Sequence, residues 1–176
     1  MLRSALESAT HRLRYPVKQS RIKKVSGRLR RIWVGKDELP KGDEQMLRLL
    51  VVDGEESICF SIKEYFTLHG YCVDTAQDLG EAERLVEETI YDAVIQDLRL
   101  GPALKPDGLE MIKFARSRSS DTKIIVLTAY GSPEMEKEAI QYGADAFLRK
   151  PKPLSHVAQV IQGLIESPPK QAPQSV

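Results

Sequence analysis

The strongest constraint on the fold is a regular alternation of short apolar runs and helical patterns between residues 46 and 166. Compact apolar runs predict strands at 47–52, 71–75, 92–96, 123–127 and 146–148. Apolar residues at helical spacing, with start and stop signals, predict helices at 55–69, 78–88, 109–116, 132–143 and 154–165. This alternation predicts an α/β fold with a single doubly wound, five-stranded parallel sheet and helices on both faces.

Charge divides the chain into a basic arm and an acidic body. Residues 1–45 hold 12 Lys and Arg against 5 Asp and Glu, whereas residues 46–176 hold 14 against 20. We interpret 1–45 as a basic N-terminal extension and linker, mostly disordered; nucleic acid or anionic membrane binding by this extension is the alternative. Three prolines in ten residues predict a disordered tail at 167–176.

The sequence contains no feature of a membrane or secreted protein. No apolar run approaches the ~20 residues needed to span a bilayer, and the basic N-terminus lacks an apolar core. Cys59 and Cys72 lack a Cys-x-x-Cys spacing, so we expect small buried hydrophobic residues rather than a disulfide or metal pair. These features predict a cytoplasmic protein without a membrane span.

Polar residues stand at the ends of four predicted strands. Asp53, Asp97, Thr128 and Lys150 follow the first, third, fourth and fifth strands. Parallel strands open on one edge of the sheet, so these side chains are expected to meet there. Carboxylates suit Mg²⁺, a hydroxyl and an ammonium suit phosphate oxygens, and an aspartate can attack phosphorus. Each residue alone also has a plain structural explanation, as a helix cap, a loop opener, a strand end or a surface lysine.

Five segments together resemble the successive motifs of a response-regulator receiver domain of two-component signalling. They are 49–55 (Leu-Leu-Val-Val-Asp-Gly-Glu), 91–100 (Tyr-Asp-Ala-Val-Ile-Gln-Asp-Leu-Arg-Leu), 107–110 (Asp-Gly-Leu-Glu), 125–129 (Ile-Val-Leu-Thr-Ala) and 143–151 (Gly-Ala-Asp-Ala-Phe-Leu-Arg-Lys-Pro). The resemblance spans residues 46–166. It implies a flavodoxin-like sheet with strand order 2-1-3-4-5 and a phosphorylation switch, not an enzyme acting on an external substrate.

The resemblance also implies roles for individual residues. Asp97 would accept a phosphoryl group from a histidine kinase or a histidine phosphotransfer protein. Asp53, Asp97 and the backbone carbonyl of Arg99 would hold Mg²⁺. Thr128 would hydrogen-bond a phosphoryl oxygen, Lys150 would pair with the carboxylate or the phosphate, and a cis peptide would join Lys150 to Pro151.

A second set of implications concerns the output of the switch. Phe147 stands at the position of the aromatic that moves inward on phosphorylation in this family. An unknown output protein would dock on the face of the fourth helix, fifth strand and fifth helix. Only ten residues follow Glu166, which is too few for a DNA-binding module, so we expect an action through protein contacts.

Two features depart from the family pattern. The family places two acids after the first strand, but here Gly54 takes the second position, so one anionic metal ligand is missing and Mg²⁺ binding is expected to weaken. Glu55 or Glu56 could compensate, or could only favour the dipole of the next helix. The segment from Asp97 to Gly108 is also longer than the usual spacing by about three residues, a difference that a tolerated surface insertion explains.

Two other functions are alternatives, the first because of the missing ligand and the second because an aspartate nucleophile on such a sheet also occurs in phosphatases. A pseudo-receiver would keep the fold and dock partners without phosphorylation. A phosphatase of the haloacid-dehalogenase kind would use Asp97 as its nucleophile, but it needs a second acid two residues later, where this chain has Arg99. Binding that is unchanged by Asp97→Ala would favour the first, and turnover of a phosphomonoester would favour the second.

Overall fold

The computed structural model describes residues 21–25, 28–32, 45–100 and 107–167. The expected disordered tail lies outside these residues from position 168 onward. Part of the basic extension is described only as backbone strands.

Five parallel strands form the central sheet. They are β4 (Arg48–Val52), β5 (Cys72–Ala76), β6 (Ala93–Gln96), β7 (Lys123–Thr128) and β8 (Ala146–Arg149). Their spatial order is β5-β4-β6-β7-β8, which is 2-1-3-4-5 when these five are counted along the chain. The predicted fold class and strand order are therefore confirmed.

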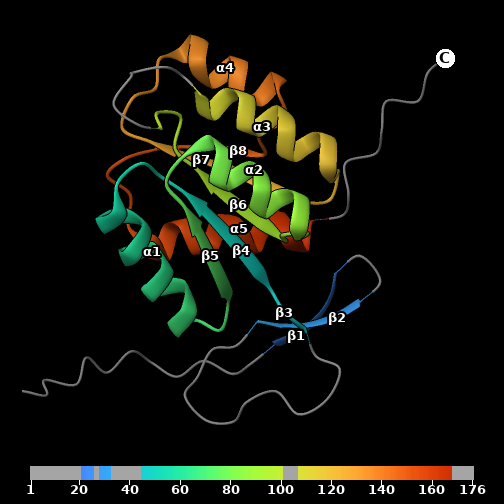
Figure 1. Ribbon diagram of the computed structural model, residues 1–176. Helices are drawn as coiled ribbons and strands as arrows, with labels where there is room; N and C mark the ends of the chain where they lie inside the picture. Colours follow the sequence, from blue (N-terminus) through green and yellow to red (C-terminus); the bar gives the residue numbers. More distant parts are fainter. Residues whose placement is uncertain (1–20, 26–27, 33–44, 101–106, 168–176) are drawn as a thin grey trace, which may run out of the picture.

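Helices cover both faces of the sheet, as Figure 1 shows. On one face lie α1 (Glu56–Leu68) and α5 (Leu154–Glu166), and on the other lie α2 (Leu79–Glu88), α3 (Asp107–Arg118) and α4 (Pro133–Gln141). Strand β4 explains this two-sided packing, because alternate side chains point to opposite faces. Leu49 and Val51 join the core under α1 and α5, while Leu50 and Val52 join the core under the other helices.

The helix start and stop signals in the sequence act as predicted. The Asp78 carboxylate accepts a hydrogen bond from the backbone N–H of Glu81 at 2.9 Å, and the Ser132 hydroxyl accepts one from the N–H of Met135 at 3.3 Å. After α1 and α4 the chain turns through Gly70 and Gly143, with φ of 80° and 110°. Residues with a side chain rarely adopt this left-handed backbone conformation, so glycine is well suited to end both helices.

A second, smaller sheet corrects our expectation for two short segments of the basic extension; residues 1–20, 26–27 and 33–44 lie outside the described residues. Strand β1 (Arg21–Val25) pairs antiparallel with β2 (Arg28–Ile32), and β2 pairs parallel with β3 (Gln45–Met46). We expected a mostly disordered segment here because its charge dominated the interpretation. The overlooked signal is the two-residue Ser-Gly break between two basic segments that carry β-branched residues, a spacing typical of a hairpin.

None of the described helices is long and apolar enough to cross a membrane.

Candidate functional site

Two buried carboxylates stand side by side at the carboxyl end of the sheet. Asp53 follows β4 and Asp97 follows β6, and these strands are neighbours through the pair Val52 and Gln96. The N–H of Asp97 donates to the carbonyl of Val52 at 2.8 Å, which fixes the position of Asp97 beside β4. Asp53 is only 4% exposed and Asp97 only 8%, so neither carboxylate is an ordinary surface acid.

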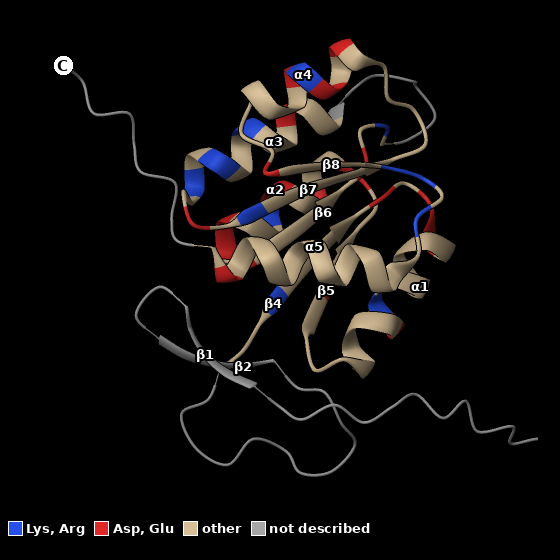
Figure 2. Cartoon of the chain, turned by 180° about the vertical axis from the view of Figure 1, so that it is seen from behind, with Lys and Arg blue, Asp and Glu red and all other residues tan. Residues whose placement is uncertain are grey.

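A hydroxyl and an ammonium complete the group. The Thr128 hydroxyl, fully buried at the end of β7, donates to Asp97 Oδ1 at 2.8 Å. Lys150, just after β8, donates from Nζ to Asp53 Oδ2 at 2.5 Å and to Asp97 Oδ2 at 2.8 Å. Figure 2 shows acidic and basic segments together at this edge of the sheet, beside α1. The four residues therefore meet as the strand ends predict.

The electrostatic balance of the group is negative, because one ammonium faces two carboxylates. Burial raises the pKa of Asp53, and this effect outweighs the lowering by its hydrogen bonds to Lys150 and to the N–H of Glu55. Burial alone would lower the pKa of Lys150, but its hydrogen bonds to both carboxylates raise it instead. The raised pKa keeps Lys150 protonated, and carboxylate oxygens such as those of Asp53 and Asp97 are ligands that suit a divalent cation.

Sequence comparison identifies the family of this arrangement. The family model for the response regulator receiver domain matches residues 49–162, which include all four site residues. The chain belongs to the receiver-domain family. Receivers of this family act in two-component signalling, generally as non-enzymatic domains that typically bind Mg²⁺.

Relatives of this receiver include longer response regulators. Response regulator MprA from Mycobacterium sp. (strain KMS) is 35% identical over 130 residues, covering 73% of this chain and 55% of the relative. This chain therefore spans about half the length of the curated relatives it matches. Response regulators work with histidine kinases and output domains.

Solved receivers share the fold. The beryllofluoride-activated NtrC4 receiver domain dimer is 35% identical, with a TM-score of 0.61 over 68% of this chain and 96% of the other. A response regulator from Burkholderia pseudomallei, solved with a phosphorylated aspartic acid, a calcium ion and citrate, is 28% identical, with a TM-score of 0.62 over 66% of each chain.

The site has one carboxylate fewer than the resemblance implies, because Gly54 stands where a second acid is expected. Asp53 and Asp97 offer two carboxylates, and Mg²⁺ can bind to one or two carboxylates while it keeps several waters. Glu55 and Glu56 are exposed, and no group of three or more His, Cys, Asp or Glu side chains placed to hold a metal occurs in the described part of the chain. Compensation for Gly54 by Glu55 or Glu56 therefore stays a prediction.

The remaining predicted residues lie in the loops and strand around this group. The N–H of Arg99 donates to Asp97 Oδ1 at 3.2 Å, so the start of the loop after β6 folds back toward the carboxylate. Phe147 is half-buried and packs against the core under α2, α3 and α4. Its ring lies against Gly131, where an added Cβ would stand 2.8 Å from Cε1 and Cζ. The peptide between Lys150 and Pro151 is cis, as the resemblance implied.

Sequence reasoning missed Tyr130. The Arg99 guanidinium lies over the Tyr130 ring, 3.8 Å from its centroid. Arg99 is two residues after Asp97, and Tyr130 is two residues after Thr128. This stack therefore joins the two loops on either side of the hydrogen bond between Asp97 and Thr128. The sequence signal for this stack is that a basic residue and an aromatic residue each follow a site residue by two positions.

Cys59 lies directly beneath the site. Its thiol donates to the carbonyl of Asp53 at 3.3 Å, and burial raises its pKa to about 11. Cys59 is 3% exposed and belongs to the apolar core, which confirms the expectation of a buried hydrophobic role; Cys72 is only half-buried, and both cysteines are free.

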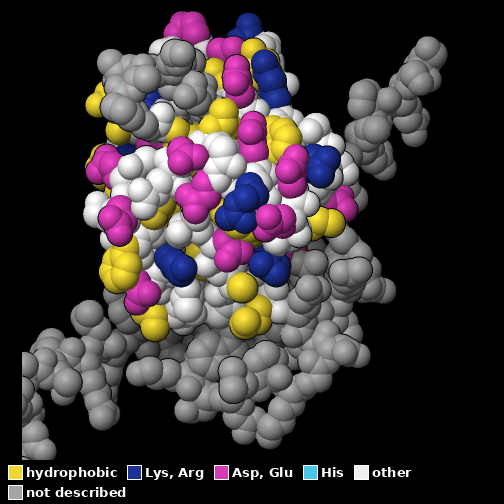
Figure 3. Space-filling view, viewed as in Figure 1, with side chains coloured by type: hydrophobic (Ala, Val, Ile, Leu, Met, Phe, Trp, Pro, Cys, Tyr) yellow, Lys and Arg dark blue, Asp and Glu magenta, His cyan; other side chains and the backbone are white. Residues whose placement is uncertain are grey.

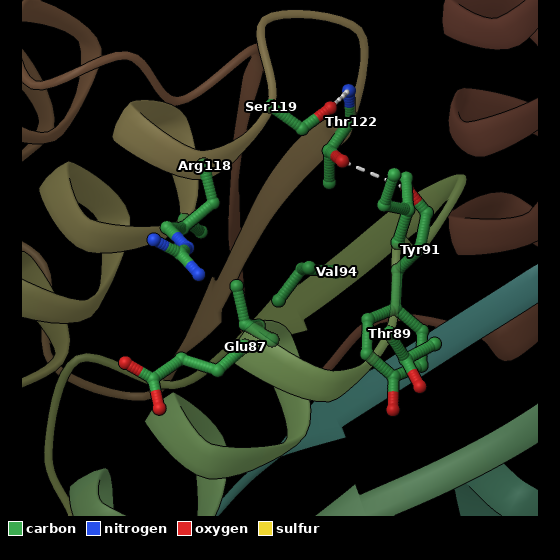
Figure 4. Close-up of a pocket in the computed structure, with 10 residues that line it drawn as sticks. Glu87, Thr89, Tyr91, Val94, Arg118, Ser119 and Thr122 are labelled. Atoms are coloured by element: carbon green, nitrogen blue, oxygen red, sulfur yellow. Dashed lines mark hydrogen bonds between the residues drawn. The ribbon is translucent and has the colours of Figure 1, made fainter.

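A cavity of about 230 Å³ lies at the other end of the sheet. Figure 4 shows Glu87 and Arg118 at its sides, with Thr122 donating from its hydroxyl to the carbonyl of Tyr91. Tyr91 precedes β6 and Thr122 precedes β7, whereas Asp97 and Thr128 are at the opposite ends of these strands. This cavity is therefore not part of the carboxylate site.

Proposed function

We propose that this receiver accepts a phosphoryl group on Asp97 from a histidine kinase or a histidine phosphotransfer protein, and that phosphorylation switches its contacts with other proteins. The supporting observation is the environment of one carboxylate. Asp97 receives hydrogen bonds from Thr128 at 2.8 Å and Lys150 at 2.8 Å, so a donor and a cation already stand where phosphoryl oxygens would need them.

The proposed chemistry gives Asp97, Thr128 and Lys150 one role each. A carboxylate oxygen of Asp97 attacks phosphorus, a new O–P bond forms, and the P–N bond of the donor phosphohistidine breaks. The Thr128 hydroxyl then donates to a phosphoryl oxygen instead of to the carboxylate. Lys150 stays protonated and offsets the repulsion between the anionic carboxylate and the anionic phosphoryl group.

Mg²⁺ is the expected cofactor, with Asp53, Asp97 and the Arg99 carbonyl as its ligands. When bound, it would neutralise charge on the transferring phosphoryl group. Because Gly54 supplies no carboxylate, we propose that the affinity for Mg²⁺ is lower than in receivers with two acids at this point. The same substitution supports a second candidate, a pseudo-receiver that docks partners without phosphorylation.

The proposed output surface is formed by α4, β8 and α5. We propose that the protein acts in the cytoplasm. Helix α5 contains no Asp, Glu, Lys or Arg from Leu154 to Ile165. Figure 3 shows acidic and basic side chains interspersed over the face with α2 and α3. Phe147 on β8 lies against Gly131 in the loop that leads from Thr128 to α4, so a movement of Thr128 could reach this surface through the ring. Nucleic acid binding is proposed for no part of the chain other than the basic extension, residues 1–45.

Phosphorylation with acetyl phosphate at stepped Mg²⁺ concentrations tests this proposal. Intact mass spectrometry should show the addition of one phosphoryl group in the wild type and none in Asp97→Asn. Gly54→Asp should shift the response to lower Mg²⁺ concentrations because it adds one carboxylate ligand. No addition at any Mg²⁺ concentration, with partner binding unchanged in Asp97→Asn, would favour the pseudo-receiver.

A further inference from the structure

Gln96, the residue before Asp97, is an amide in a fully buried strand. It is 0% exposed. It lies two residues after Val94, on the same face of β6, which packs under α2, α3 and α4. Its neighbours across the sheet are Val52 and Val126, both fully buried hydrophobic residues. An apolar side chain would suit this position better, because burying an amide without full hydrogen bonding destabilises the fold.

The Gln96 amide makes one close contact, with the main chain of the next residue. Its Nε2 donates to the carbonyl of Asp97 at 2.5 Å. Its Oε1 is buried and has no hydrogen-bond partner among the described residues. The side chain therefore keeps one unsatisfied oxygen in the core while it holds the backbone of Asp97.

The held carbonyl belongs to the peptide that turns the chain out of β6. The N–H of Asp97 is bound by β4, and the Leu98 carbonyl accepts from the N–H of Gly108 at 3.2 Å. The Asp97 carbonyl lies beyond the last ladder position of β6 and would otherwise have no strand partner. It is closely packed, since a Cβ added to Gly108 would stand 2.3 Å from its oxygen. Gln96 thus supplies a donor to a carbonyl that the ladder of β6 does not reach.

We infer that Gln96 is a positioning residue, whose side-chain amide holds the Asp97 peptide so that the Asp97 carboxylate and the following Arg99 segment keep the orientation needed for phosphorylation. This inference rests on the proposed function. Gln96 touches no reacting atom; it acts through the main chain of Asp97.

The hydrogen-bond balance separates this role from simple stabilisation. In Gln96→Leu, the unsatisfied Gln oxygen disappears, but the Asp97 carbonyl loses its donor. One buried oxygen stays unsatisfied in either protein, so the thermal unfolding midpoint should change little. The phosphorylation rate should fall, because the Asp97 carbonyl loses the donor that orients it.

The test compares the full-length chain with Gln96→Leu and Gln96→Met, the second keeping the unbranched shape if the first does not fold. Ile124→Val, on the same sheet face but paired with Val94 rather than Gln96, is the matched packing control. We expect the rate with acetyl phosphate at saturating Mg²⁺ to fall roughly fivefold per folded molecule in the Gln96 variants, about the worth of one hydrogen bond. The control should keep the wild-type rate.

Two results would overturn the inference. One is a wild-type rate in folded Gln96→Leu or Gln96→Met. The other is an equal loss of rate in Ile124→Val, which would trace the effect to core packing. A wild type that is not phosphorylated at all would overturn the proposed function itself, and this inference with it, before any variant is compared. The two failures are therefore distinguished by the wild-type sample.

Discussion

Replacing Lys150 by methionine removes the one cation that separates two buried carboxylates. The Lys150 side chain is 17% exposed, and those of Asp53 and Asp97 are 5% and 10% exposed. Breaking a buried ion pair by removing one partner typically costs 3–5 kcal/mol, and the partial exposure of the lysine places this case near the lower end, at about 3 kcal/mol at pH 8. For a domain of this size that corresponds to roughly 10 °C in the unfolding midpoint.

The pH dependence of this loss follows from the protonation of Asp53. Burial raises the pKa of Asp53, so the folded state holds a proton on this carboxyl more tightly than the unfolded state does. Without the lysine, its ionised form becomes less favourable still, and the destabilisation must grow as the pH rises. We expect Lys150→Met to lose about half as much stability at pH 5 as at pH 8. In the wild type, the raised pKa of Lys150 keeps its contribution intact until the pH exceeds the usual range of lysine.

Urea unfolding at pH 5 and pH 8 measures this effect. Lys152→Met removes an exposed lysine two residues away and should change the free energy of unfolding by less than about 0.5 kcal/mol. Adding Asp97→Asn to Lys150→Met should recover part of the loss, because only one buried carboxylate then remains. A loss below about 1 kcal/mol at pH 8, or one that does not depend on pH, would refute the assigned role of Lys150.

Three other perturbations test local features of the site. At pH 8 an alkylating reagent should modify Cys59 at least about tenfold more slowly than Cys72, because Cys59 is 3% exposed and its pKa is raised to about 11. Equal rates by peptide mass spectrometry would contradict this. Gly108→Ala should destabilise the fold by about 2 kcal/mol in urea, because the new Cβ would meet the carbonyl oxygen of Asp97; no loss would show that the packing is looser than described. Tyr130→Ala removes the stack with Arg99 and should shorten the lifetime of the phosphorylated form about threefold, the equivalent of ~0.7 kcal/mol; an unchanged lifetime would separate the stack from the site.

The sequence predicted the sheet and the meeting of the site residues for the same reason. Four of the five strands have a polar site residue at or just after their carboxyl end, and parallel strands with helical crossovers bring those ends to one edge. Asp53, Asp97, Thr128 and Lys150 were therefore placed correctly without knowledge of a single contact.

Features that depend on side-chain reach were beyond such reasoning. The sequence identifies Gln96 only as the last residue of a strand. It does not predict that the Gln96 amide donates to the carbonyl of Asp97. The stack of Arg99 on Tyr130 joins two loops whose separation the sequence does not fix. Strands β1 and β2 were missed because a high density of Lys and Arg outweighed a short hairpin signal.

Locating the phosphoryl group tests the central claim most directly. The chain is treated with acetyl phosphate and Mg²⁺, the acyl phosphate is trapped by borohydride reduction, and the modified residue is identified by tandem mass spectrometry. Our account predicts modification at Asp97 alone, with a much lower yield in Thr128→Ala and Lys150→Met. Modification at another acid, or none under conditions that phosphorylate a control receiver with two acids after its first strand, would contradict it.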